Sequence, residues 1–167
     1  HNGIEMKNGK PTILVTRSLP SDVEKIMTDL FDSRFNATDV PMTGEEIVNS
    51  ACDVDALVPT VTDNFNADLI SRLPSSVKII ANFGVGVNHI DIAHANSLGI
   101  VVTNTPDVLT EDTADLAICL LLAAPRRVAE GDRMIRSGTW DGWSPTSMVG
   151  HRVFGKKLGI IGMGRIG

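Results

Sequence analysis

The sequence predicts an α/β fold with a mainly parallel sheet and helices on both of its faces. Over roughly the first hundred residues, short β-branched runs alternate with amphipathic stretches, the pattern of strands joined by helical crossovers. Hydrophobic residues make up 43% of the 167 residues and charged residues 21%, as in ordinary globular proteins, so we expect the chain to bury a core.

Each predicted element follows from its local pattern. Pro20 and the two residues after it open the first helix, whose apolar residues recur on one side. Thr43 and Glu46 have the spacing of a capping box, and Gly99 stands where a helix is expected to stop. In chain order we expect a strand at 13–16, a helix at 20–30, a helix at 43–51, a strand at 55–59, a helix at 66–73, a strand at 77–82, a helix at 90–98 and a strand at 100–103.

This block predicts a flavodoxin-like domain at 1–105, followed by a segment of different character at 106–167. From Thr110 a long helical pattern begins, and it is apolar on every side over 118–124. Such a helix must be covered all round, so we expect it to lie between two domains. Pro125 falls inside the pattern, which predicts either a kink there or a new helix with Pro125 as its first residue.

Residues 137–151 are rich in Gly, Ser and Pro and predict an irregular connection. It contains Trp140 and Trp143, for which we favour packing on the parent fold over an exposed subunit interface. The apolar run at 157–161 then predicts a strand, the first of a Rossmann dinucleotide-binding domain.

Two glycine turns follow predicted strands. Gly162-Met163-Gly164-Arg165-Ile166-Gly167 matches the dinucleotide fingerprint G-x-G-x-x-G, a weak pattern that the preceding strand strengthens. The residue about 20 positions further on that would select NAD or NADP is not in this sequence. The turn at 82–88 would present backbone amides outside the carboxyl ends of the sheet, but from spacing alone a plain strand-to-helix turn is the better interpretation.

Several classes of function are disfavoured. A net charge of −5 argues against nucleic-acid binding, and no run of about 18 apolar residues predicts a membrane span. Residues 1–10 have no apolar signal stretch, so we expect a cytoplasmic protein, with Cys52 and Cys119 as buried free thiols. His89 and His94 are five residues apart, which is not a metal-ligand spacing, and we expect surface histidines. No G-x-S-x-G elbow indicates a hydrolase.

Five motifs in a fixed order carry a family resemblance. They are NFGVGVNHID at 82–91, TPDVLTEDTAD at 105–115, APRR at 124–127, GTW at 138–140 and KKLGIIGMGRIG at 156–167. Together they resemble the D-isomer-specific 2-hydroxyacid dehydrogenases, and most of all the glyoxylate/hydroxypyruvate reductase branch. Pro125 departs from the small or apolar residue that the family commonly has there.

The resemblance implies a substrate domain and a Rossmann domain with the active site between them, so that the two glycine turns face each other. It implies that the amides of Val85 and Gly86 hold the carboxylate of a small 2-keto or 2-hydroxy acid, and that Val61 lines the substrate pocket. It also implies a homodimer that uses NAD or NADP. The residues implied in dinucleotide contact are Val85, Thr113, Gly162, Gly164, Arg165, Ile166 and Gly167.

The family's catalytic arginine and its histidine–carboxylate pair belong to the later part of the Rossmann domain, so the resemblance places no catalytic residue in this chain and implies no turnover by the chain alone. A non-enzymatic, dinucleotide-sensing interaction protein on the same scaffold is the alternative, because fold does not fix function. A phospho-acceptor receiver module is disfavoured, since Arg17 and Ser18 stand where it needs acidic residues.

Overall fold

The computed structural model describes residues 9–167. Residues 1–8, most of the segment in which the sequence predicts no signal, lie outside the described part. The chain divides into two compact units, His1–Pro106 and Asp107–Gly167, and each is described by itself. None of the helices in the described part is long and apolar enough to span a membrane.

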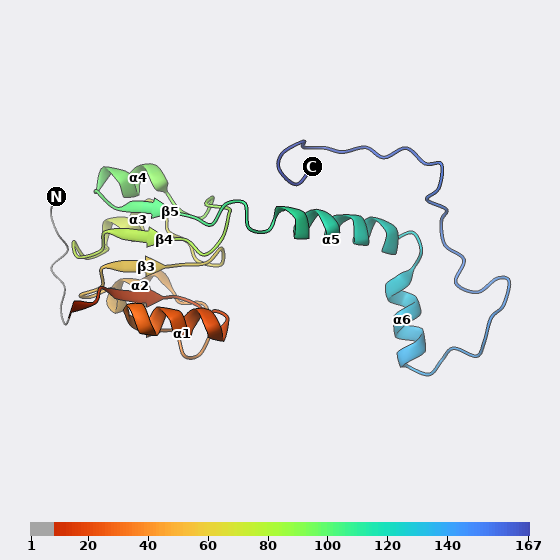
Figure 1. Ribbon diagram of the computed structural model, residues 1–167, viewed down its shortest axis with the longest axis horizontal. Helices are drawn as coiled ribbons and strands as arrows, with labels where there is room; N and C mark the ends of the chain where they lie inside the picture. The colour runs from red at the N-terminus through yellow and green to blue at the C-terminus, as the bar shows by residue number, and fades with distance from the viewer. Residues whose placement is uncertain (1–8) are drawn as a thin grey trace. The chain divides into compact units, whose positions relative to one another are not determined.

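The first unit is an α/β domain that alternates strands and helices (Figure 1). All of the predicted strands and helices of this unit are present, and one further strand, β2, joins them. The first strand is shifted by one residue, and the other elements are shorter than the sequence predicts. In chain order the elements are β1 (Thr12–Val15), α1 (Ser21–Leu30), β2 (Asp32–Phe35), α2 (Gly44–Ser50), β3 (Ala56–Val58), α3 (Ala67–Ser71), β4 (Ile79–Ala81), α4 (Ile92–Ser97) and β5 (Val101–Thr103).

The five strands form one parallel sheet in the order β2-β1-β3-β4-β5. This is the flavodoxin-like order, so the predicted parallel α/β fold is confirmed. The strand order reverses between β1 and β3, and open α/β sheets bind ligands outside the carboxyl ends of the strands at such a switch point. The loops that follow β1, β3 and β4 are therefore where a ligand site is expected.

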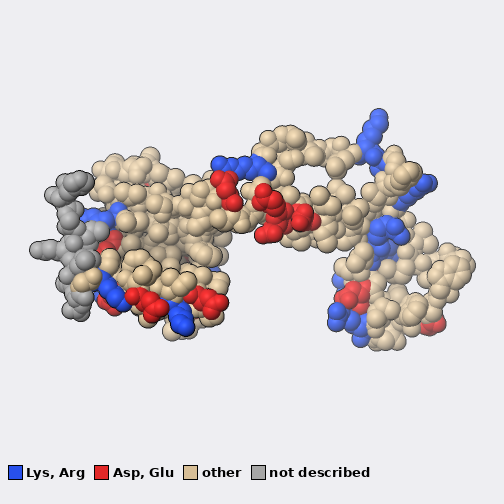
Figure 2. All heavy atoms as spheres, viewed as in Figure 1, with Lys and Arg blue, Asp and Glu red and all other residues tan. Residues whose placement is uncertain are grey.

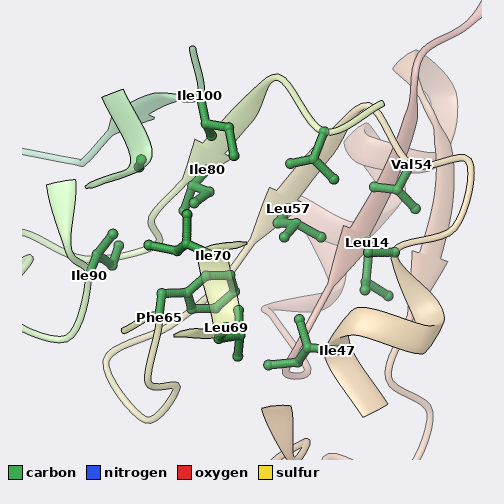
Figure 3. Close-up of a cluster of buried hydrophobic side chains, with 13 residues drawn as sticks. Leu14, Ile47, Val54, Leu57, Phe65, Leu69, Ile70, Ile80, Ile90 and Ile100 are labelled. Carbon is green, nitrogen blue, oxygen red and sulfur yellow. The ribbon is translucent and has the colours of Figure 1, made fainter. Parts of the chain in front are cut away.

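Two apolar layers lie on opposite faces of the sheet. The larger cluster joins Leu14, Leu57 and Ile80 of the strands to side chains of the helices, among them Ile47 of α2 and Ile70 of α3 (Figure 3). Alternate residues of the same strands point to the other face, because successive side chains of a strand project to opposite sides. There the smaller cluster packs against α1.

The α1 face is less completely covered. A cavity of about 340 Å³ lies over β3, β4 and β5, where the sheet presents the small side chains of Ala56 and Ala81. The outer surface of α1 carries acidic and basic side chains side by side (Figure 2), as expected for a solvated helix face. The sheet is thus packed by three helices on one face and by α1 on the other.

The sequence analysis did not predict β2. Its four residues are Asp-Ser-Arg-Phe, with Asp32 and Arg34 exposed and Ser33 and Phe35 half-buried. Its position at the sheet edge allows this composition, since short polar edge strands avoid pairing with other chains. Arg34 also donates hydrogen bonds to the carbonyls of Ser50 and Cys52 at the end of α2.

The second unit contains α5 (Thr110–Ala123) and α6 (Val128–Arg136). The predicted break at Pro125 is present, but Pro125 is not the first residue of the new helix, which begins three residues later behind a left-handed Arg127. Because the helix has ended, the Pro125 carbonyl is available and accepts a hydrogen bond from the N–H of His151 at 2.7 Å. The loop at 150–151 therefore docks onto the break.

Two expectations from the sequence were wrong. Residues 157–161 form no strand, because no partner strand lies beside them in the described part of the chain. Trp140 and Trp143 are exposed in this chain, and their packing on the parent fold stays a prediction. Cys52 and Cys119 are free, as expected, but exposed rather than buried: Cys52 follows the end of α2, and Cys119 is on α5, which buries none of its residues.

Substitution of Ile80 tests whether the sheet core carries the stability of the first unit. Ile80 is fully buried in β4, so Ile80→Ala should lower the free energy of unfolding by about 2–5 kcal/mol. Ile26 on α1 is 57% exposed, and Ile26→Ala should change it by less than about 0.5 kcal/mol. Urea unfolding is followed by far-ultraviolet circular dichroism. Tryptophan fluorescence would not report on the first unit, because both tryptophans lie in the other unit. Equal effects of the two substitutions would contradict this account of the core.

Candidate functional site

A polar cluster lies where β1, β3 and β4 end, at the switch point of the sheet. Thr16 follows β1, Thr60 and Asp63 follow β3, and Asn82 follows β4. Thr16, Asp63 and Asn82 are buried, which is unusual for polar side chains and requires hydrogen-bond partners. The partners come mostly from one another and from the backbone of the adjoining turns.

Asn82 organises the glycine turn after β4. Its Nδ2 atom donates to the carbonyl oxygens of Gly84 at 3.1 Å and Gly86 at 3.0 Å. Its Oδ1 atom faces Nε2 of His89 at 2.9 Å. Its own backbone N–H donates to Thr103 of β5, which ties the turn to the sheet.

These contacts aim two backbone N–H groups away from the protein. The Gly84 carbonyl accepts from Asn82, and the Val85 carbonyl accepts from Nδ2 of Asn104 at 2.9 Å. In a trans peptide the N–H points opposite to the carbonyl of the same peptide, so the N–H groups of Val85 and Gly86 point away from these donors. Neither N–H donates to an acceptor within residues 9–167. The turn therefore offers two adjacent donors to an anion.

Val61 stands next to this turn. It lies in the loop after β3 and is 62% exposed. A methyl group at Gly84 would come within 3.3 Å of Cγ1 of Val61 and 3.4 Å of Nδ2 of Asn82. The structure therefore places Val61 beside the turn of Val85 and Gly86, and its role in lining a substrate pocket stays a prediction.

Asp63 holds the Val61 loop against the sheet. Its Oδ2 atom accepts from Oγ1 of Thr16 at 2.6 Å and from the N–H of Thr60 at 2.8 Å. Its Oδ1 atom is buried with no hydrogen-bond partner in the described part of the chain. One carboxylate thus joins the ends of β1 and β3 and fixes the base of the loop.

Arg17 adds a second connection. Its guanidinium donates to Oδ1 of Asp39 and to Oγ1 of Thr62, both at 2.9 Å. The hydrogen bond from Arg17 lowers the pKa of the Asp39 carboxyl, and the N–H of Ser18 lowers it further. The same pair raises the pKa of Arg17, so the ion pair persists over the neutral range.

His89 is half-buried beside the turn. Burial lowers the pKa of its imidazole, and the negative charge of Asp63 offsets part of this effect. His94, the other histidine of the motif region, has a different setting on α4, where Nε2 lies 2.7 Å from Oγ of Ser71. Only His89 contacts the glycine turn.

The other residues implied in dinucleotide binding lie in the second unit. Gly162 has a φ of 92°, which favours glycine, and a Cβ at Gly167 would overlap the Gly162 carbonyl. No atom lies within 4 Å of a Cβ built at Gly164. The loop is therefore closed by its first and last glycines and open at the middle one.

The surroundings of this loop are apolar. An open cavity of about 580 Å³ is lined by α5 residues such as Ala117 and Leu121 and by residues 158–162. Thr113 donates its hydroxyl to the Leu109 carbonyl at 2.8 Å, and Arg165 pairs with Asp107. Ile166 lines the cavity.

Sequence reasoning missed the residues that hold the turn in place. Asn82 and His89 lie inside a quoted motif, Arg17 served only to argue against another function, and Asp63 and Asn104 were not singled out. The only signal for Asn82 was a polar residue directly after a buried strand, and Asp63, in the loop after β3, had no such signal. Within residues 9–167, no three His, Cys, Asp or Glu side chains are grouped to hold a metal ion.

The lowered pKa of His89 predicts a pH dependence of stability. In the range below the ordinary pKa of 6.5, the unfolded chain binds a proton at this site more readily than the folded chain. The free energy of unfolding should therefore fall as pH decreases through this range. His89→Gln should reduce that fall, whereas His94→Gln keeps His89 and should keep its contribution. Urea unfolding between about pH 5 and pH 8 measures this pH dependence of the free energy of unfolding. A pH dependence in His89→Gln equal to that of the wild type would disprove the role of His89.

Comparison with known proteins agrees with this architecture. The chain is 43% identical over 159 residues to a glyoxylate reductase of Korarchaeum cryptofilum, covering 95% of the chain and 48% of that protein. It is 41% identical over 162 residues to a glyoxylate reductase of Pyrococcus horikoshii, again covering 48% of the relative. The chain thus spans about half the length of the curated relatives it matches.

Solved structures give the same result. A protein of Polaromonas sp. JS6 66, described as a D-isomer-specific 2-hydroxyacid dehydrogenase, matches with a TM-score of 0.85 at 41% identity, over 94% of this chain and 49% of that one. A glyoxylate/hydroxypyruvate reductase of Sinorhizobium meliloti, solved with NADP and malonate, matches with a TM-score of 0.75 at 32% identity, over 95% and 48%. Residues 13–158 match the model of the catalytic domain of D-isomer-specific 2-hydroxyacid dehydrogenases, and the chain belongs to this family.

Proposed function

We propose that this chain is the substrate-binding half of an NADH- or NADPH-dependent reductase that converts a small 2-keto acid, of the glyoxylate or hydroxypyruvate type, to the D-2-hydroxy acid. The observation that carries the proposal is the pair of outward N–H groups at Val85 and Gly86. They lie after β4, next to the switch point of a parallel sheet, where ligands are bound in this class of fold.

The substrate carboxylate would accept hydrogen bonds from these two N–H groups. Because the opposing carbonyls are already bound by Asn82 and Asn104, the donors are oriented before the substrate arrives. Val61 would contact the substituent on the 2-carbon and so limit its size. The malonate in the Sinorhizobium meliloti structure supports a small-acid ligand for a relative of this chain.

The glycine loop at the end of the chain fits a dinucleotide pyrophosphate. Gly162 supplies the tight turn, and Gly167 allows close packing against it, while the open space at Gly164 permits close approach of a phosphate. Arg165, Ile166 and Thr113 are the further proposed contacts, together with Val85 from the first unit. The dinucleotide would supply a hydride to the keto carbon.

This chain would bind and orient the keto acid and the dinucleotide, and it would not catalyse the reaction alone. The arginine and the histidine–carboxylate pair of the family would come from the other half of the parent protein, so none of the residues described here is proposed as a catalytic acid or base. In the whole protein the first unit would act as the substrate domain, and α5 would connect it to the nucleotide-binding domain. A cytoplasmic location is proposed with this function.

A homodimer is proposed because of the apolar surface of the second unit. α5 leaves Leu116, Ile118 and Leu120 exposed, and Trp140 and Trp143 are exposed as well. Figure 2 shows acidic side chains at the start of α5 and uncharged surface along the rest of it. Contiguous apolar surface of this kind marks an interaction site. Light scattering of the full-length protein measures the oligomeric state.

The function is tested with the full-length protein. We expect oxidation of NADH or NADPH on addition of glyoxylate or hydroxypyruvate, and no turnover by the 167-residue chain. The reactions are followed by the absorbance of the reduced nicotinamide. A folded full-length protein that binds a dinucleotide but reduces neither acid would favour the sensing function on the same scaffold instead.

Gly84 tests the coupling between the turn and the Val61 loop. Gly84→Ala places a methyl group 3.3 Å from Cγ1 of Val61, and the φ of 157° at Gly84 also disfavours a side chain, so the turn or the loop must move. In the full-length enzyme we expect the KM for the keto acid to rise by about three- to tenfold, as for a loss on the order of 1 kcal/mol in binding. Adding Val61→Ala should recover part of this loss.

The control is Gly131→Ala in α6, where the added methyl group meets only ordinary contact distances. It should leave the KM unchanged. An unchanged KM in Gly84→Ala, or no recovery in the double variant, would show that the two loops are not coupled.

A further inference from the structure

The connection between His89 and the glycine turn depends on which atoms of Asn82 face which partners. Nδ2 of Asn82 lies 3.1 Å from the Gly84 oxygen and 3.0 Å from the Gly86 oxygen. A flipped amide would put Oδ1 against both carbonyls, where two acceptors repel each other. Asn82 therefore presents its NH2 group to the turn and its oxygen to His89.

This orientation fixes the tautomer of His89. The Asn82 oxygen can only accept, so Nε2 of His89, at 2.9 Å, must carry the proton. A chain of donors results, from the His89 ring to Oδ1 of Asn82, and from Nδ2 of Asn82 to the two carbonyls. The chain is partly shielded from water, since Asn82 is buried and His89 half-buried.

This series of hydrogen bonds leads from His89 to the N–H donors proposed for the substrate. The Gly84 carbonyl belongs to the same peptide group as the N–H of Val85, and it accepts hydrogen bonds from Nδ2 of Asn82 and from the N–H of Thr105, each at 3.1 Å. Rotation of Asn82 would remove one of the two donors that hold the direction of the Val85 N–H. Gly86 is bound by the same NH2 group, which fixes the turn on both sides of Val85. His89 is the only side chain whose hydrogen bond holds the oxygen end of Asn82 in the described part of the chain.

We propose that His89 is a positioning residue for the acid substrate, and that it acts through Asn82 to aim the N–H of Val85 at the carboxylate, beside the N–H of Gly86 that Asn104 orients. The inference rests on the proposed function, and it assigns to His89 neither substrate contact nor proton transfer. What the site requires of His89 is one N–H donor at the position of Nε2.

Removing this donor need not disrupt the fold. The His89 carbonyl accepts the N–H of Phe65 at 2.8 Å, and the Ile90 N–H bonds to Val87, so the backbone on both sides of the side chain stays paired. His89→Ala removes the donor, and His89→Gln restores an N–H donor at a similar reach. His94→Gln is the matched control, because its hydrogen bond to Ser71 lies away from the turn.

In the full-length enzyme, His89→Ala should raise the KM for the keto acid about tenfold, the effect of losing a hydrogen bond worth on the order of 1.4 kcal/mol, while kcat changes by less than about threefold. His89→Gln and His94→Gln should keep the wild-type KM within about twofold. A KM that stays unchanged in His89→Ala, or that rises equally in His89→Gln, would overturn the proposal.

Two further measurements keep the test independent of folding and of the proposed function. Asn82→Asp keeps the shape of the side chain but replaces the NH2 donor by an acceptor, and it should raise the KM at least as much as His89→Ala; an unchanged KM would contradict the donor chain. In the 167-residue chain without ligand, the amide resonances of Val85 and Gly86 should shift in His89→Ala and not in His89→Gln. If the wild-type enzyme reduces no keto acid, the proposed function fails, and these resonances still decide whether His89 positions the turn.

Discussion

The side-chain amide of Asn82 is the interaction on which the candidate site depends. Asn82 directly follows β4 and is buried. Its amide donates hydrogen bonds to two carbonyls of a turn that no regular secondary structure stabilises. A buried amide must have its hydrogen bonds satisfied, because leaving one unmade costs about 1–3 kcal/mol. The turn therefore cannot relax without exposing or orphaning Asn82, and this makes a flexible glycine segment rigid.

The parallel sheet explains why so many polar groups meet at one place. All carboxyl ends of the strands lie at the same edge, so the loops after β1, β3 and β4 are neighbours whatever their distance in the sequence. Asp63 bonds to the end of β1, Arg17 reaches the β3 loop, and Val61 of that loop lies 3.3 Å from where a Cβ at position 84 would stand. The apolar core below holds the strands in register, and the polar groups above hold the loops. The rigidity of the site is thus a consequence of the fold.

The sequence predicted the parts of the molecule that depend on local patterns. Buried strands and amphipathic helices have characteristic periods, and the capping box of Thr43 and Glu46 is present with both of its hydrogen bonds. The polar edge strand β2 has no such pattern, because only its pairing with β1 makes it a strand. Residues 157–161 show the converse, an apolar run that forms no strand without a partner beside it.

The site was predictable only in part, because its supporting contacts, like the pairing of β2, have no local sequence pattern. Val61, Val85 and Gly86 were identified through a family resemblance, whereas Asn82, Asp63 and His89 act through contacts that spacing does not reveal. Glycines in a turn indicate backbone freedom, and freedom alone does not distinguish an anion site from an ordinary turn. What distinguishes them here is that the carbonyls of three successive peptides are occupied, and the sequence carries no direct sign of that occupancy.

The acidity of the chain does not conflict with an anionic ligand. The net charge of the sequence is −5, and charges separated by more than about 8–10 Å are largely screened at ordinary salt. The donors proposed for the carboxylate are backbone N–H groups, which carry no charge to be screened and need no counter-ion. Arg17, the cation after β1, is already paired with Asp39. Recognition by oriented amides therefore selects an acid by geometry and needs no net positive charge at the site.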